Sequence, residues 1–260
     1  MSESKSKANI EKEVKEEVLE TVEEDLVTEE DILESAEEET GINLEEDINA
    51  WTPKTELGWK VRNGEITSLK ELVGNGLRIK EEALVDFLCP DLQIDFLTIG
   101  QSKGKFGGGK RKAYRVTQKI TAEGSNIKFS AMAVVSDGTG IVGLGTGSSI
   151  ETVPTRNKAE KAAKLNLIDT IRGCGSWECN CSDPHSIPFA IEGKSGSVTV
   201  KVMPAPKGTG LAVNDTTKQL LGAAGIKDAW SVTKGQTVTR FNLAKATFNA
   251  LKQLKEMRSR

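Results

Sequence analysis

The clearest pattern in the chain is the alternation of apolar and polar residues in short segments that are separated by glycine-rich turns. Residues 92–99 and 127–135 alternate in this way, and residues 136–140 (SDGTG) have the composition of a tight turn before residues 141–144. A period of two is typical of strands that are covered mainly on one face. We therefore expect three strands in this part of the chain.

A helix is expected directly after these strands. Pro154 suits the first turn of a helix, which we predict to run to about Ile171. Within it, Ala159, Ala162 and Ala163 form a stripe of small residues that would let the helix lie close to a sheet. The order strand, strand, strand, helix defines a first structural unit.

A second unit follows a connector that is rich in cysteine, glycine and serine. Residues 187–191 and 198–202 alternate on either side of a Gly-Lys-Ser-Gly turn, which predicts a hairpin. We expect a helix over residues 215–224, a short strand over 229–232 and a closing helix. The closing helix is marked by an apolar stripe at spacings of three and four: Phe241, Ala244, Phe248 and Leu251. The pattern predicts an α+β protein of two small domains with antiparallel or mixed sheets.

The charge of the chain is divided between two opposite segments. Residues 1–48 contain 16 Glu, 3 Asp and 4 Lys, a net charge of −15, so the rest of the chain carries +12 within a total of −3. A Glu-rich segment without aromatic residues predicts a solvated and mostly disordered tail, although apolar residues at every fourth position between Ile10 and Leu26 leave a partner-induced helix open. The basic body predicts a polyanionic partner.

Composition also argues against membrane and secreted classes of protein. No apolar run approaches the roughly 18 residues that a membrane span requires, and the first residues lack the apolar core of a secretion signal. Three of the four cysteines are crowded between Cys174 and Cys181. This arrangement suits a reducing cytoplasm better than a disulfide scaffold, so we expect a cytoplasmic protein with no membrane partner.

A basic loop over residues 100–112 holds five glycines and five lysines or arginines. Its residues 104–111 come one residue short of a phosphate-cradling P-loop, which leaves a nucleotide-binding enzyme as an alternative function. Arg111 stands where a hydroxyl should ligate magnesium, and no helix is predicted to begin after it. A basic loop laid against a nucleic-acid backbone explains the residues better, and a merely solvated loop remains possible.

Three glycines at alternate positions, Gly143, Gly145 and Gly147, invite comparison with a dinucleotide-binding turn. Their spacing is wrong for that turn, and no acidic partner for a ribose is evident. We expect instead glycines on a strand edge that allow another backbone to approach closely.

Four zinc-competent side chains fall within twelve residues: Cys174, Cys179, Cys181 and His185, the last being the sole histidine of the chain. Three thiolates and an imidazole could hold one structural zinc ion. The spacing is not that of a common zinc finger, and two ligands separated by one residue are awkward on a tetrahedral metal. Reduced cysteines packed at the domain junction, or a Cys–His nucleophilic pair, are the alternatives.

A family resemblance rests on several of these segments together. It is carried by RGCGSWECNC at 172–181, PHSIP at 184–188, GKSGSV at 193–198, PAPKGTGL at 204–211, AGIKDAW at 224–230, AKLNLI at 163–168 and WTPKTELG at 51–58. In this order they resemble the archaeal members of the S-five family of small-subunit ribosomal proteins, from residue 51 to about residue 251.

The resemblance implies a fold and a division of the chain. The first domain would resemble a double-stranded-RNA-binding domain, and the second would be of the left-handed βαβ type. The expected segments are an acidic tail (1–48), a lead-in with short helices (49–90), the N-terminal RNA-binding domain (91–172), a Cys/Gly-rich connector (173–186) and the C-terminal domain (187–260).

The resemblance also implies a ribosomal function without catalysis. It places such a protein at the back of the small subunit near the neck, in contact with small-subunit rRNA and with ribosomal proteins S-four and S-eight. It further implies an influence on decoding accuracy and on messenger RNA near the entry channel. A free-standing double-stranded-RNA-binding protein is the alternative.

The residues expected to bind RNA are lysines and arginines of the body. In the family the loop that faces the neck is rich in arginine, but residues 121–126 (TAEGSN) contain none. We therefore expect the basic loop before it to supply the missing charge to rRNA phosphates. The candidate residues are Lys103, Lys105, Lys110, Arg111, Lys112, Arg115, Lys119, Lys128 and Lys194.

Overall fold

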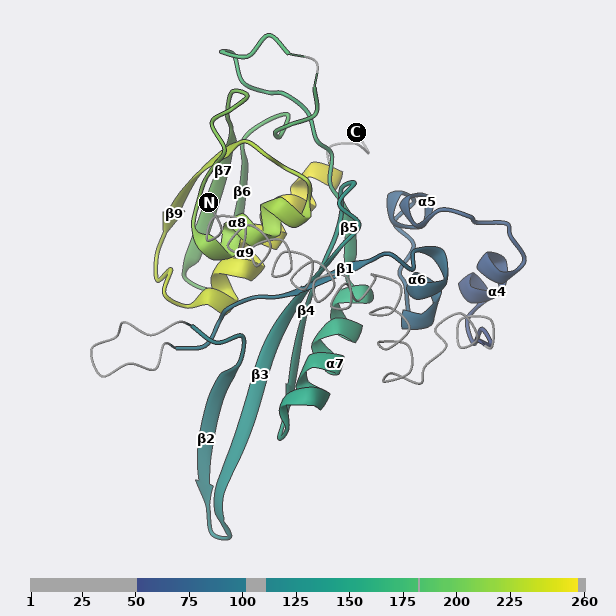
Figure 1. Ribbon diagram of the computed structural model, residues 1–260, viewed down its shortest axis with the longest axis vertical. Coiled ribbons are helices and arrows are strands. Elements are labelled where there is room, and N and C mark those ends of the chain that lie inside the picture. The colour runs from purple at the N-terminus through teal and green to yellow at the C-terminus, as the bar shows by residue number, and fades with distance from the viewer. Residues whose placement is uncertain (1–50, 102–110, 182, 257–260) are drawn as a thin grey trace, which may run out of the picture. The chain divides into compact units, whose positions relative to one another are not determined.

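The structure is a computed structural model that describes residues 51–101, 111–181 and 183–256 (Figure 1). The predicted acidic tail and most of the basic loop lie outside the described residues. Within the part that is described, no helix is long and apolar enough to cross a membrane.

The described chain begins with three short helices, as expected for the lead-in: α4 (Glu56–Arg62), α5 (Leu69–Gly74) and α6 (Glu82–Leu88). The first two have hydroxyl N-caps, because Thr55 and Ser68 each accept a hydrogen bond from a backbone N–H three residues later, both at 3.2 Å. Each of these two helices ends at an asparagine followed by a glycine, which accounts for their shortness.

The first sheet is antiparallel throughout and contains five strands: β1 (Gln93–Phe96), β2 (Arg115–Thr121), β3 (Gly124–Ser136), β4 (Ile141–Ser149) and β5 (Leu167–Asp169). The order is β1-β3-β4-β5, and β2 pairs with the outer half of the same long strand β3. The β2–β3 hairpin therefore extends beyond the rest of the sheet (Figure 1). The three predicted strands are all present.

Two strands of this sheet were not predicted. We expected the helix that begins near Pro154 to continue to Ile171, but α7 (Thr152–Lys164) ends earlier. The chain then turns at Asn166, whose side-chain amide donates to the Leu144 carbonyl at 2.9 Å, and continues as β5. Strand β2 escaped detection because all but the last of its residues are exposed, so apolar residues do not mark a buried face.

Helix α7 packs on one face of the first sheet, directly against β4. The glycines at 143, 145 and 147 do allow a close backbone approach, because an ideal Cβ on Gly145 would lie 2.1 Å from the Ala163 backbone nitrogen. Ala159 and Ala163 are fully buried in this contact. The expectation of a strand edge was wrong, however, since β4 lies between β3 and β5.

The second sheet is mixed and contains β6 (Ile191–Ser195), β7 (Val198–Pro204), β8 (Leu211–Ala212) and β9 (Ala229–Lys234) in the order β6-β7-β9-β8. Strands β8 and β9 are parallel and are joined through α8 (Asp215–Ala223). The predicted helix and short strand are confirmed. The predicted hairpin is present but displaced, because its first strand, expected over residues 187–191, runs from Ile191 to Ser195, and the chain turns at Gly196, which has a φ of 58°. The closing helix, α9 (Arg240–Glu256), packs against β6 and β7 together with α8.

One apolar core serves both sheets. The face of the first sheet that α7 leaves free contributes Met132, Val134 and Leu144 to the same cluster as Leu220 of α8 and Leu251 of α9. The two modules are therefore parts of one packed α+β body.

Candidate nucleic-acid interface and metal centre

The exposed β2–β3 hairpin carries a basic face. Arg115 and Lys119 lie on β2, and Lys128 lies on β3, where the register pairs Arg115 with Ser130 and Thr117 with Lys128. Residues that are directly paired, or two apart along a strand, point to the same side of a sheet. Three of the predicted RNA-binding residues are thus brought together on one exposed face, the face opposite α7.

A groove lies at the inner end of this basic face, between the sheet and α9. It has a volume of about 420 Å³ and is lined by two cations, Arg115 and Lys245, together with four hydroxyl side chains and the Phe241 ring. The Arg115 guanidinium lies 5.9 Å from the centre of that ring, within the range of a cation–π contact. None of the described residues that line the groove carries a carboxylate.

Lys245 was not among the predicted binding residues. The spacing of the apolar stripe in α9 placed it on a solvent-facing side of the helix, but sequence alone could not show which other element that side meets. The structure brings it next to Arg115, which is 130 residues earlier in the chain.

The other predicted RNA-binding residues are more scattered. Arg111 and Lys112 are exposed immediately before β2, so they can extend the basic face. Lys194 is exposed on β6, in the other sheet, and does not join them. Lys103, Lys105 and Lys110 lie outside the described residues.

The opposite face of the same hairpin carries exposed apolar side chains around one polar pair, Gln118 and Ser125. Val116 and Ile120 on β2 and Ile127 on β3 are 54%, 83% and 44% exposed. Helix α7 covers only the inner part of the sheet (Figure 1), and these three residues of the projecting hairpin are not among the members of the core beneath it. A surface strip of this kind is typical of a binding site for another macromolecule.

A second exposed surface lies on the face of β7 and β9 that the helices do not cover. Met203, Trp230 and Val232 form its apolar centre, and Lys201 and Lys234 flank it. A shallow cavity of about 290 Å³ lies in this surface. We call it the outer sheet face.

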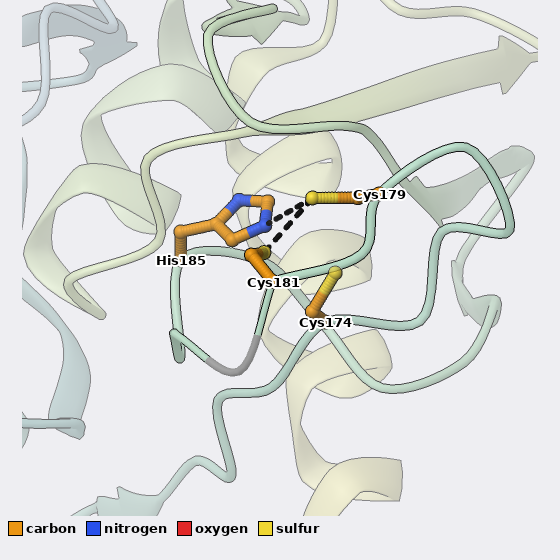
Figure 2. A group of neighbouring side chains, drawn as sticks. All are labelled: Cys174, Cys179, Cys181 and His185. Carbon is orange, nitrogen blue, oxygen red and sulfur yellow. Dashed lines mark hydrogen bonds between the residues drawn. The ribbon is translucent and has the colours of Figure 1, made fainter.

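The connector between the two sheets brings the four zinc-competent residues together. One ligand atom each from Cys174, Cys179, Cys181 and His185 lies within 4.8 Å of the other three (Figure 2). The sulfurs of Cys179 and Cys181 are 2.8 Å apart, and the Cys179 sulfur lies 3.7 Å from His185 Nε2. The one-residue spacing of the last two cysteines, which looked awkward in the sequence, does not prevent this convergence.

Backbone pairing creates the cluster. Gly173 and Ser186 exchange hydrogen bonds in both directions at 2.9 Å, and the Gly175 N–H donates to the Ile187 carbonyl at 3.2 Å. The two ends of the connector are therefore held side by side, with Cys174 on one and His185 on the other. Trp177, at the tip between them, is 91% exposed, so the indole does not provide a local core.

The distances are close to those of a tetrahedral metal site. A zinc ion with bonds of about 2.3 Å to sulfur would hold two sulfurs about 3.8 Å apart. The Cys179–Cys181 contact is shorter than this, and all four ligand atoms lie within 4.8 Å of one another. Side-chain rotations that shift these atoms by about 1 Å would therefore place all four at bonding distance from one zinc ion.

Two of the neighbouring thiols, Cys179 and Cys181, have pKa values that are shifted in opposite directions. The hydrogen bond from Cys181, with help from the Lys207 backbone N–H, lowers the pKa of Cys179 to about 6. The same contact with Cys179 raises the pKa of Cys181 to about 11. One thiolate with a neighbouring thiol is a favourable starting arrangement for a metal, which displaces the remaining protons.

His185 is held by a buried carboxylate that the sequence did not indicate. Its Nδ1 lies 2.8 Å from Asp228 Oδ2, and both side chains are almost completely buried. Burial alone would raise the pKa of Asp228, but hydrogen bonds from the Gly210 N–H and from His185 hold it below its usual value. Asp228 is therefore an anion that accepts the imidazole N–H.

Two models of known protein families match this chain. The family model described as Ribosomal protein S5, N-terminal domain, matches residues 112–170, and the one described as Ribosomal protein S5, C-terminal domain, matches residues 193–259. These matches define a ribosomal protein with two S5 domains.

Curated relatives extend the match over most of the chain. The small ribosomal subunit protein uS5 of Nanoarchaeum equitans is 46% identical over 217 residues, which are 84% of this chain and 91% of the relative. The uS5 proteins of Picrophilus torridus (46% identical; 78% of this chain and 85% of the relative) and Staphylothermus marinus (44%; 80% and 90%) are similar to the same extent. The chain therefore belongs to the uS5 family, a family of structural, non-enzymatic proteins of the small ribosomal subunit.

Proposed function

We propose that the chain is a structural constituent of the small subunit of the cytoplasmic ribosome, where the basic face of the β2–β3 hairpin binds rRNA. The observation that carries this proposal is the alignment of Arg115, Lys119 and Lys128 on one exposed face beside a groove without carboxylates. Through this contact the protein supports the neck region, decoding accuracy and messenger RNA entry.

The chemistry of the face fits a ribose-phosphate backbone better than a base edge. Lysine and arginine neutralise phosphates, and the serine and threonine hydroxyls of the groove can bond to phosphate or 2′-hydroxyl oxygens. Among the described residues that line the groove, only Phe241 is aromatic, and the Arg115 guanidinium lies over its ring rather than leaving it free to stack on a base. Recognition of RNA shape rather than of sequence follows.

Replacing Arg115, Lys119 and Lys128 together with glutamine should weaken binding of the full chain to small-subunit rRNA. Each lost phosphate contact reduces the slope of log affinity against log salt by about one, so the triple variant should lose about two to three units of slope. Filter binding over a range of salt concentrations measures this slope, and thermal unfolding shows whether the loss of the Arg115–Phe241 contact matters for stability.

The control replaces Lys70, Lys80 and Lys158 with glutamine. These lysines are exposed on the lead-in and on α7, away from the basic face, and their removal changes the net charge equally. The control should retain nearly the whole salt slope. If both triple variants lose the same slope, net charge rather than the hairpin governs binding, and the proposed interface is wrong.

We further propose that the two exposed apolar surfaces bind neighbouring ribosomal proteins, S-four and S-eight. Tryptophan and methionine at the centre of a polar rim are typical of protein interfaces, and the outer sheet face has Trp230 and Met203 in that position. The apolar strip of the hairpin, with Ile120 and Ile127, is the second such surface.

A pair of variants tests these contacts, and each serves as the other's control. Val232→Asp with Trp230→Ala changes the outer sheet face, whereas Ile120→Asp with Ile127→Asp changes the hairpin strip. All four side chains are exposed, so neither variant should unfold the chain. Calorimetry with purified S-four and S-eight of the same organism should show that each variant loses at least tenfold in affinity for one partner. Unchanged binding of both partners by both variants would contradict the proposal.

We also propose that Cys174, Cys179, Cys181 and His185 hold one structural zinc ion. The convergence of four soft or borderline ligand atoms within 4.8 Å supports this proposal, and the ligand set makes a closed site with no open position for substrate. Elemental analysis of the purified full chain tests it: one zinc per chain is expected. Iron with acid-labile sulfide would assign an iron–sulfur cluster instead, and the absence of any metal would leave reduced cysteines packed together.

A further inference from the structure

Asp228 is a buried carboxylate that RNA binding and the metal ligands do not use. It lies directly before β9 and is 5% exposed. Its two oxygens have different partners: Oδ2 faces His185 Nδ1 at 2.8 Å, and Oδ1 accepts the backbone N–H groups of Gly210 at 2.7 Å and Gly208 at 3.1 Å. One carboxylate thus connects the imidazole to a loop.

The contact with His185 determines which ring nitrogen is free. Because the Asp228 carboxylate can only accept, the proton of the neutral imidazole lies on Nδ1 and the lone pair lies on Nε2. Nε2 is the nitrogen that points at the Cys179 sulfur, 3.7 Å away (Figure 2). The ring is therefore held in the tautomer and orientation that a metal ligand needs.

The loop on the other side, residues 204–210, depends on the same carboxylate. Gly208 and Gly210 both have positive φ values, 91° and 72°, a conformation that exposes backbone N–H groups toward one point. Asp228 occupies that point. The loop also contacts the cysteine cluster directly, because the Lys207 backbone N–H donates to the Cys179 sulfur.

We infer that Asp228 is a positioning residue for the metal centre, and that it couples metal binding at His185 to the conformation of the 204–210 loop. This inference rests on the proposed zinc site. It adds Asp228 to the four proposed ligands and predicts that the 204–210 loop responds to the metal. When zinc polarises the imidazole, the Nδ1–H bond to Asp228 strengthens, and the carboxylate is held more firmly in place beneath the two glycine N–H groups.

Asparagine at position 228 cannot serve both sides at once. It has one acceptor oxygen and one amide group that donates. If its oxygen faces the glycines, its NH₂ faces Nδ1 and favours the imidazole tautomer that cannot bind the metal through Nε2. If its oxygen faces His185, two glycine donors meet the NH₂. Two hydrogen bonds outweigh one, so the first arrangement should predominate.

The test measures zinc affinity and amide exchange in the full chain. Asp228→Asn should bind zinc 10- to 100-fold more weakly than the wild type in competition with a chromogenic chelator. In the wild type, removal of zinc should accelerate hydrogen exchange at the Gly208 and Gly210 amides. This second measurement needs no variant, so a failure of Asp228→Asn to fold does not decide the question.

Ser186→Ala is the matched control. Ser186 donates to the Asp228 backbone carbonyl at 2.5 Å and accepts the Ala205 N–H at 3.3 Å, so this change loosens the same region and leaves the carboxylate intact. It should lower stability but leave zinc affinity within about threefold of the wild type. Equal losses in both variants, full affinity in Asp228→Asn, or exchange that does not respond to zinc would each overturn the inference. A wild-type chain that binds no zinc would instead overturn the proposed metal site itself.

Discussion

Gly145→Ala should destabilise the chain by about 3 kcal/mol or more, among the largest effects of any methyl group added to it. The new Cβ would lie 2.1 Å from the Ala163 nitrogen and 2.2 Å from the Ala159 carbonyl oxygen. Both are backbone atoms of α7, so the helix must move as a whole rather than adjust one side chain. Urea unfolding, followed by circular dichroism, measures the loss.

Gly222→Ala provides the comparison for that measurement. Gly222 is exposed within α8, and a Cβ there would meet no atom within 4 Å. Alanine in this position should leave stability unchanged or raise it by up to about 1 kcal/mol, because it restricts the unfolded chain and favours the helix. A Gly145→Ala variant as stable as Gly222→Ala would show that α7 does not lie as close to β4 as described.

The elements that the sequence predicted are those with a buried face. Strand β3 was found from its apolar residues, although its inner half is covered on both faces rather than mainly on one: Met132 and Val134 face one core and Ala131 and Ala133 the other. Helix α9 shows its stripe because β6 and β7 cover one side. Strand β2 has no buried face. Strand β5 has three residues, too few to show a period, and its position depends on pairing with β4, far back in the sequence.

The cluster of zinc-competent residues could be predicted because its members are close in sequence and chemically distinctive. Asp228 could not, since it lies 43 residues from His185 in a segment that offers no hint of its partner. The basic face of the hairpin could be predicted only in part. Its cations were identified from composition, but their common orientation depends on the β2–β3 register, and Lys245 joins them through tertiary packing.

Cys181→Ser should abolish stoichiometric zinc binding in the presence of a competing chelator and lower the melting temperature by about 5–10 °C. Serine cannot replace the thiolate as a zinc ligand, and the connector, whose tryptophan is exposed, has little apolar core of its own to compensate. A decrease of about 3 kcal/mol in the free energy of unfolding corresponds to such a shift of the melting temperature in a chain of this size. Differential scanning calorimetry and elemental analysis measure the two quantities.

Chelation and a distant cysteine supply the controls. The wild type stripped of zinc should melt at the temperature of Cys181→Ser, and the variant should not respond to chelator at all. Cys89, which follows α6 and lies outside the cluster, can be changed to serine without loss of zinc. If Cys181→Ser keeps its zinc and its melting temperature, the four residues are ordinary packing.

The core that both sheets share cannot form completely while the chain is still being synthesised. Met132, Val134 and Leu144 emerge from the exit tunnel well before Leu251 of α9, which belongs to the same core. At about 5–20 residues per second, the roughly 110 residues between residue 144 and residue 254 take about 5–20 s to translate. Until α8 has been made, the first sheet has α7 on one side and no helix on the other. The nascent chain therefore exposes an apolar sheet face to chaperones until α8 and α9 cover it.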